Sequence, residues 1–224
     1  MTLISEIVAP RRGSRLRVLH ADHEEWRRTS ADVVKALGLR AGHIEPAEDL
    51  AARIEAAEPT FARDRAYRLL AYRDRTAHEL RERLVEDGYP AALSAGIVAD
   101  LTRVGLVDDD RYARTSARSL ATVRGFGRNR ILRELEAKGV DPGLAAAATT
   151  EALPEHDEEA SALRLARALT SRPKADVARI ATRLARKGFA PALALKTARR
   201  ALAELADGDA PDLPVLDDWP PPER

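Results

Sequence analysis

The stretch RILRELEAKGV, residues 130–140, decides the fold of this chain because related stretches occur once before it and once after it. These are ELRERLVEDGY at residues 79–89 and RIATRLARKGF at residues 179–189. Each predicts a helix that ends at its glycine, which supplies a left-handed backbone conformation that other residues resist. The three glycines are about 50 residues apart, and such a period is typical of a repeat array whose units bury apolar faces partly against their neighbours.

Each repeated stretch is the middle part of a unit that predicts three helices. A helix-forming segment precedes it, and a third helix follows the glycine with Pro90, Pro142 or Pro191 near its first turn. In the first unit, Thr76 and Glu79 have the spacing of a capping box, in which two side chains satisfy backbone donors at a helix start. We therefore predict a mainly α protein with three tandem three-helix repeats.

The N-terminal segment has a different pattern. LISEIV and SRLRVLHADHEEW are short and rich in β-branched or apolar residues, which predicts an antiparallel hairpin or three-strand unit with a turn at Ala21 and Asp22. Ser30 is expected to begin a short helix that stops at Gly38. A second helix is expected to begin at Pro46 and to end near Pro59.

The expected organisation has five parts. They are a small β-rich N-terminal extension at 1–61, three-helix repeats at 62–107, 108–155 and 156–206, and an acidic tail at 207–224. The tail contains five prolines and six acidic residues, and we expect it to be disordered.

The composition excludes several classes of protein. The chain has 224 residues and no cysteine, which excludes disulfides, thiolate metal sites and thiol catalysis. Its first residues do not have the pattern of a signal peptide. No apolar stretch approaches the roughly 18 residues of a membrane helix. We therefore expect a soluble, cytoplasmic protein.

Charge is unevenly distributed along the chain. The net charge is +1, yet residues 62–205 carry 27 basic and 20 acidic side chains, whereas residues 206–224 carry 1 basic and 6 acidic ones. A basic body with an acidic tail indicates a polyanionic or acidic partner, with the tail as an internal competitor.

Three consecutive aspartates are the strongest candidates for catalytic or metal chemistry. Asp108 stands where the second repeat is expected to begin its first helix, and Asp109 and Asp110 fall in the first turn. Aspartates there accept hydrogen bonds from free backbone N–H groups and are favoured by the helix dipole. A cation site would need further ligands, and the adjacent arginines would oppose it. Helix capping is therefore the favoured interpretation.

Two other motifs are weaker candidates. HADHEE, residues 20–25, contains possible zinc ligands, but no second ligand motif accompanies it, so we interpret it as a polar hairpin turn. RGFGR, residues 124–128, lacks the length and the Lys-Ser/Thr pair of a phosphate-binding loop, and is interpreted as a connection between helices. No histidine is placed to activate a nucleophile, so we expect no catalytic site, no metal and no cofactor.

Arginines form the most informative charge pattern. Between residues 111 and 133 the chain has seven arginines and no acidic residue, namely Arg111, Arg114, Arg118, Arg124, Arg128, Arg130 and Arg133. A solvated helix face normally mixes both signs, so we interpret this run as a binding surface suited to carboxylates or phosphates. Charge reversal within it is expected to relieve like-charge crowding. A weaker cluster in the third repeat consists of Arg179, Arg183, Arg186 and Lys187.

The chain resembles the RecX family of regulatory proteins, which modulate the bacterial recombinase RecA. The resemblance rests on LLAYRDRTAHELRERLVEDGY, on the junction GLVDDDRYA and on GFGRNRILRELEAKGV, with RIATRLARKGF as a weaker echo. It spans residues 62–205. SADVVKALGLRAGH is similar to an N-terminal extension of some members.

This resemblance implies a non-enzymatic protein whose repeats form an elongated, curved array. Such a protein would lie in the groove of the RecA filament on single-stranded DNA. It would inhibit strand exchange, ATP hydrolysis and co-protease activity in recombinational repair and the SOS response. We expect a monomer whose basic face meets acidic recombinase patches, the single-stranded DNA within the filament, or both. The alternatives are a nucleic-acid-binding helical module without recombinase specificity and a scaffold for an unrelated acidic partner.

Overall fold

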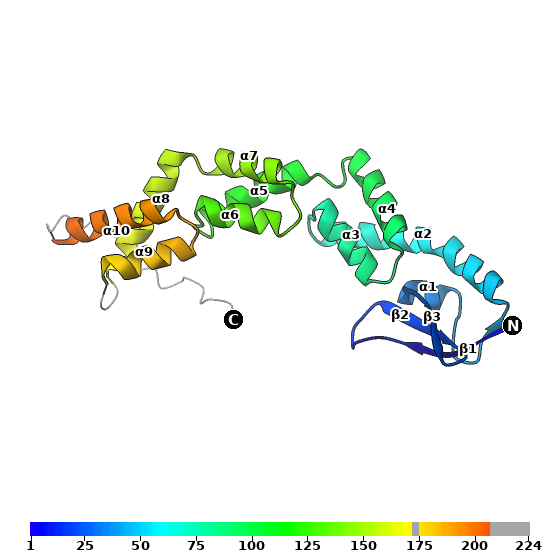
Figure 1. Ribbon diagram of the computed structural model, residues 1–224. Helices are drawn as coiled ribbons and strands as arrows, with labels where there is room; N and C mark the ends of the chain where they lie inside the picture. Colours follow the sequence, from blue (N-terminus) through cyan, green and yellow to red (C-terminus); the bar gives the residue numbers. More distant parts are fainter. Residues whose placement is uncertain (172–174, 207–224) are drawn as a thin grey trace. The chain divides into compact units, whose positions relative to one another are not determined.

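The computed structural model describes residues 1–171 and 175–206, and it begins with a small sheet that is followed by helices (Figure 1). The chain divides into two compact units, Met1–Asp109 and Asp110–Arg224. The tail predicted to be disordered, 207–224, lies outside the described residues. None of the helices in the described part of the chain combines the length and apolar composition of a membrane span.

The sheet of the first unit has four antiparallel strands in the order β3-β2-β1-β4. Their bounds are Thr2–Val8 for β1, Leu16–Ala21 for β2, Glu24–Ser30 for β3 and Ile44–Glu45 for β4. Asp22 and His23 form the turn between β2 and β3, with φ angles of 52° and 69°. Two consecutive positive φ angles match the right-handed twist of a hairpin. The predicted antiparallel unit is confirmed, but its turn lies one residue later than predicted, because Ala21 pairs with Glu24. β4 adds a short strand that the sequence pattern did not indicate.

The helix that follows β3 begins and ends where the sequence predicts. α1 spans Ala31–Ala36, and the Ser30 hydroxyl accepts a hydrogen bond of 3.2 Å from the N–H of Val33. Gly38 follows with a φ angle of +65°. This serine satisfies one of the N–H groups that have no partner within the first turn of a helix.

The prediction that a helix ends near Pro59 is wrong, because α2 runs without interruption from Ala47 to Tyr72. Pro59 is exposed, so the carbonyl group that loses its helical partner can bind water. The buried side chains recur at three- to four-residue spacing through the proline: Leu50, Ile54, Glu58, Ala62, Ala66 and Leu69. Burial of this stripe outweighs the local cost of the proline, and the boundary drawn between residues 61 and 62 falls inside α2.

The first repeat continues with α3, Ala77–Glu86, and α4, Ala91–Arg103. One hydrophobic cluster joins it to the sheet, and its fully buried members include Ile4, Leu19, Val33, Leu50, Ile54, Leu80 and Leu84. Gly88 ends α3 with a φ angle of +101°, and a Cβ atom there would collide with the backbone of Thr29 in β3. The N-terminal extension and the first repeat therefore share a core.

The second and third repeats have the predicted three helices each. Repeat two consists of α5, Asp109–Thr122, α6, Arg128–Glu136, and α7, Pro142–Ala152. Repeat three consists of α8, Glu155–Thr170, α9, Val177–Arg186, and α10, Pro191–Ala206. Each of these two repeats has its own hydrophobic cluster, and at least half of the buried members of each cluster are alanines. These alanines let neighbouring helices approach closely and account for a core with few aromatic residues.

Candidate functional site

The loop before α6 lies against the end of α9 in the second unit. The N–H of Gly127 donates a hydrogen bond of 2.9 Å to the carbonyl oxygen of Lys187. The N–H of Asn129 donates one of 3.1 Å to the carbonyl oxygen of Gly188. Free donors at the start of one helix thus meet free acceptors at the end of another, which satisfies both helix ends and pairs their opposite dipoles.

Two glycines permit this approach. Gly188 has a φ angle of +95°, and a Cβ atom on it would collide with Arg130. A Cβ atom on Gly127 would lie 2.5 Å from the backbone nitrogen of Phe189. The glycine of the repeated motif therefore has a second role in the third repeat, because it also allows backbone contact with α6.

Side chains of two repeats gather where these backbones meet. The guanidinium carbon of Arg130 lies 3.9 Å from the centre of the Phe126 ring, and the Nζ of Lys187 lies 5.1 Å from it. Both distances are within the range of cation–π attraction. Lys187 Nζ also donates to the carbonyl oxygen of Arg124 at 3.2 Å, and Arg130 donates to that of Arg186 at 3.4 Å. We call these five residues the basic junction.

Positive charge at the basic junction exceeds the negative charge that accompanies it. Glu134 pairs with Arg130 at 3.3 Å. Burial, followed by the charges of Arg130 and Arg124, lowers the pKa of Lys187 to about 8. A lysine whose cationic form is disfavoured in this way would be stabilised by an incoming anion. The junction is therefore suited to bind phosphate or carboxylate groups.

Structural partners occupy several arginines of the predicted run. Arg114 and Arg118 both pair with Glu151 of α7, at 3.3 and 2.5 Å, and Arg114 also pairs with Asp110 at 3.0 Å. The run contains no acid, but acids outside it pair with these two arginines. Arg133 donates to the carbonyl oxygen of Asn129 in its own helix at 3.0 Å.

Arg128 has the most internal partners. Its side chain donates to Glu158 at 3.4 Å, to the Thr150 hydroxyl at 3.0 Å and to the Leu153 carbonyl oxygen at 2.8 Å. Its backbone N–H donates to Glu158 Oε1 at 2.9 Å. Arg128 thus joins α6 to α7 and α8, and these bonds leave its guanidinium little capacity for a partner molecule.

Other predicted residues remain available on the surface. Arg124, Arg183 and Arg186 are exposed, and within residues 1–171 and 175–206 their guanidinium groups form no hydrogen bond or ion pair. Arg179 is exposed and pairs with Asp176 at 3.3 Å, and Arg111 is exposed on α5. The structure thus brings Arg124 and Arg130 of the first predicted group together with Arg186 and Lys187 of the second.

The aspartates lie at helix starts. Asp108 directly precedes α5, and Asp109 Oδ1 accepts a hydrogen bond of 2.8 Å from the N–H of Ala77, the first residue of α3. Among the described residues, no three histidine, aspartate or glutamate side chains come together as a cation site. Asp22 and His23 of HADHEE form the hairpin turn between β2 and β3.

Sequence reasoning missed Glu158, which is a structural part of the site. Its side chain is 10% exposed and accepts the N–H of Arg128 at the start of α6. Gly127, the N-cap residue of α6, has no side chain that could do this. Arg128 and Glu158 are thirty residues apart in the chain, so no local capping pattern could reveal the contact.

Comparison with known proteins agrees with this architecture. Residues 62–101 match the first three-helix domain of RecX, and residues 108–148 match the second. The regulatory protein RecX of Amycolatopsis mediterranei is 33% identical over 147 residues, covering 64% of this chain and 84% of that protein. The regulatory protein RecX of Mycobacterium ulcerans is 36% identical over 151 residues, covering 65% and 85%.

Solved structures give the same fold. A crystal structure of regulatory protein RecX has a TM-score of 0.58 at 22% identity, covering 89% of this chain and 100% of its own. RecX from Lactobacillus salivarius has a TM-score of 0.59 at 21% identity, covering 66% and 99%.

Proposed function

Because the chain belongs to the RecX family of regulatory proteins, we propose that it binds the RecA recombinase filament on single-stranded DNA and modulates it, mainly by inhibition. In this proposal the inhibited activities are strand exchange, ATP hydrolysis and co-protease activity, in recombinational repair and the SOS response. The protein acts without catalysis, as a monomer in the cytoplasm, by occupying the filament.

The basic junction is the observation that carries the proposal. It brings four cationic side chains from two repeats to one place, and Arg124 and Arg186 are exposed. Exposed guanidinium groups bind carboxylates of a protein partner or phosphates of DNA through the same planar fork. Arg111, Arg179 and Arg183 would extend this contact as exposed cations on α5 and α9.

Titration of the protein into RecA on single-stranded DNA tests the proposal, with ATP hydrolysis as the readout. We expect the parent protein to inhibit turnover. Arg124→Glu combined with Arg186→Glu should raise the concentration needed for inhibition by more than tenfold, because reversal replaces attraction by repulsion at close range. The matched control is Arg40→Glu combined with Arg199→Glu, two exposed arginines that are not members of the junction. Unchanged ATP hydrolysis with the parent protein would overturn the proposal.

Direct nucleic-acid binding without recombinase is the second candidate. The arginine-rich junction favours it, since phosphate contacts supply most of the sequence-independent affinity of such proteins. Binding of a labelled oligothymidylate, measured across a salt series without RecA, distinguishes the two. A steep fall in affinity with salt that disappears in the Arg124→Glu and Arg186→Glu double variant would favour this candidate. Weak, salt-insensitive DNA binding together with RecA inhibition would favour the first candidate, which is modulation of the RecA filament.

A further inference from the structure

Most cations of α10 have acidic partners. Lys196 pairs with Glu159 of α8 at 2.8 Å, and Arg200 pairs with Glu204 of its own helix at 3.0 Å. Arg199 is the remaining cation of α10 and is exposed. The surface of α10 therefore offers little uncompensated positive charge to an anion.

The basic junction and the adjoining turn of α9 differ from α10. Arg124, Arg183 and Arg186 are exposed, and in the described part of the chain their guanidinium groups form no hydrogen bond or ion pair. Burial, and then the charges of Arg130 and Arg124, lower the pKa of Lys187 to about 8. An additional anion would relieve this crowding of positive charge.

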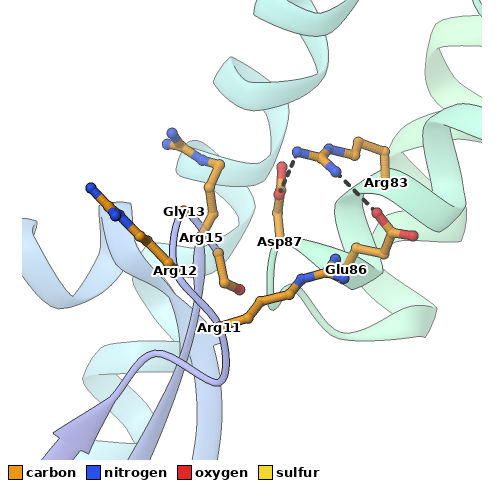
Figure 2. Close-up of a pocket in the computed structure, with 8 residues that line it drawn as sticks. Arg11, Arg12, Gly13, Arg15, Arg83, Glu86 and Asp87 are labelled. Carbon is orange, nitrogen blue, oxygen red and sulfur yellow. Dashed lines mark hydrogen bonds and ion pairs between the residues drawn. The ribbon is translucent and has the colours of Figure 1, made fainter.

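Arginines of the first unit are more evenly matched by acids. Figure 2 shows this at the cleft between the β1–β2 loop and the end of α3, where Arg83 pairs with Glu86 at 3.0 Å and with Asp87 at 3.6 Å. Arg11 and Arg12 of the loop are exposed, but they extend in opposite directions (Figure 2) and do not converge on one anion. The second unit therefore offers the better site for a negatively charged segment.

The chain itself supplies such a segment directly after α10. Residues 207–224 contain six acidic residues and one basic residue, and two of the acids, Asp217 and Asp218, are adjacent. The segment is covalently attached to the unit that carries the basic junction. Tethering of this kind gives a weak contact an effective concentration on the order of millimolar.

The length of the segment permits Asp217 and Asp218 to reach the junction. α10 has 16 residues and is about 24 Å long, and Lys187 lies four residues before its start. Asp217 follows Ala206 by eleven residues, which span up to about 36–40 Å when extended. Asp209 follows Ala206 by three residues and reaches only about 10 Å. Charge density and reach thus select the same two acids.

We propose that Asp217 and Asp218 bind Arg124 and Arg186 of the basic junction within the same chain, so that residues 207–224 compete with the partner for this surface. Carboxylates match the planar fork of a guanidinium group. Exposed ion pairs are individually weak and are screened by salt, so the contact is reversible. It therefore raises the affinity that a partner needs and favours partners with a denser negative charge. The competition rests on the proposed function, whereas the intramolecular contact does not.

A spin label on the full chain tests the intramolecular contact by nuclear magnetic resonance. The sequence has no cysteine, so Pro220→Cys provides a single attachment site beside the two acids. At low salt the label should weaken the backbone amide signals of Gly127 and Gly188 at least twofold relative to its reduced form. High salt should restore these signals, because it screens the ion pairs.

Two double variants with the same loss of charge show which acids are responsible. Asp217→Asn combined with Asp218→Asn should abolish the weakening of the signals. The matched control, Asp207→Asn combined with Asp209→Asn, should retain it, because those acids are too close to the end of α10 to reach the junction.

The surface is identified by the signals that the label affects. Arg124→Glu combined with Arg186→Glu should also abolish the weakening at Gly127 and Gly188. Equal weakening in both asparagine variants, or weakening no greater than that of Gly38 in the first unit, overturns the proposal.

Inhibition of RecA ATP hydrolysis tests the competition separately. At low salt Asp217→Asn combined with Asp218→Asn should lower the concentration needed for inhibition at least twofold, and the control pair should not. Inhibition that is the same in both pairs overturns the competition. A contact detected by the label without any inhibition by the parent protein contradicts the proposed function and leaves the contact standing. Inhibition by the parent without a detectable contact contradicts only the present proposal.

Discussion

Lys187 Nζ donates a hydrogen bond of 3.2 Å to the carbonyl oxygen of Arg124, across sixty-three residues of sequence. The contact joins the end of α9 to the loop before α6, beside the ring of Phe126. It places a partly buried ammonium next to two guanidinium groups, which is an arrangement that only a specific tertiary contact maintains.

The stability of the protein should respond to the charge of Lys187. Its pKa falls from an ordinary value of 10.5 to about 8 in the folded chain, because of burial and neighbouring cations. Between these values the unfolded chain holds a proton that the folded chain has released, so the contribution of Lys187 to unfolding free energy rises with pH. The difference in stability between the parent and Lys187→Met should therefore shift in favour of the parent from pH 7.5 to pH 10. Denaturant unfolding at both pH values checks this, and a constant difference would contradict it.

Two glycines with positive φ angles allow the cost of backbone strain to be distinguished from the cost of a steric collision. Gly38 has a φ angle of +65° with open space around it, whereas a Cβ atom on Gly188 would collide with Arg130. Gly38→Ala should cost about 1–2 kcal/mol from conformational strain alone. Gly188→Ala should cost clearly more, because α9 must also move away from α6. Chemical denaturation of both variants provides the comparison, and equal losses would show that the backbone contact is not tight.

Local patterns predicted most of the helices correctly, and tertiary burial explains the exceptions. Ser30, Thr76 and Gly88 act where their neighbours in sequence indicate, because caps and helix ends depend on a few adjacent residues. Pro59 is different, since the buried stripe of α2 extends on both sides of it and decides the helix.

The candidate site was predicted by residue type but not by grouping. The arginine run and the third-repeat cluster were recognised separately, yet their meeting around Phe126 depends on the close approach of Gly127 and Gly188. Glu151 lies outside the acid-free run and still neutralises Arg118. Counting charges along a sequence cannot detect such partners, because helix packing brings them together from distant positions.

Glu158 should be more important for stability than an ordinary surface acid. It is nearly buried and holds both the backbone N–H and the side chain of Arg128. Glu158→Ala leaves these donors without an acceptor and should cost about 1–3 kcal/mol. Glu158→Gln keeps an acceptor oxygen and should cost less. The control Glu159→Ala removes a more exposed ion pair with Lys196 and should cost at most about 1 kcal/mol. Thermal and denaturant unfolding would rank the three, and equal effects of Glu158→Ala and Glu159→Ala would argue against the cap.

Asp109 provides a test between helix capping and metal binding. Its Oδ1 accepts the N–H of Ala77, so Asp109→Ala should lower stability by about 0.5–2 kcal/mol. Asp109→Asn retains the acceptor oxygen and should be close to neutral. Calorimetry with and without a chelator checks both variants. A metal ligand would behave differently, with Asn as defective as Ala and a loss of parent stability on adding the chelator.

Because Arg118 pairs with Glu151, we now expect charge reversal at Arg118 to destabilise the protein. The sequence alone predicted the opposite, namely relief of repulsion among the arginines. Arg118 Nη2 lies 2.5 Å from Glu151 Oε1, and Arg114 approaches the other oxygen of the same carboxylate. Both arginines are more than half exposed, so each pair should contribute about 0.2–1 kcal/mol. Arg118→Glu should therefore lower the melting temperature, because it places two carboxylates together. Combining it with Glu151→Arg should restore much of the loss, since the pair is re-formed with exchanged signs. A double-mutant cycle at low and high salt measures the coupling, which should weaken as salt screens it. A melting temperature that rises in Arg118→Glu alone would show that repulsion among the arginines outweighs their attraction to Glu151.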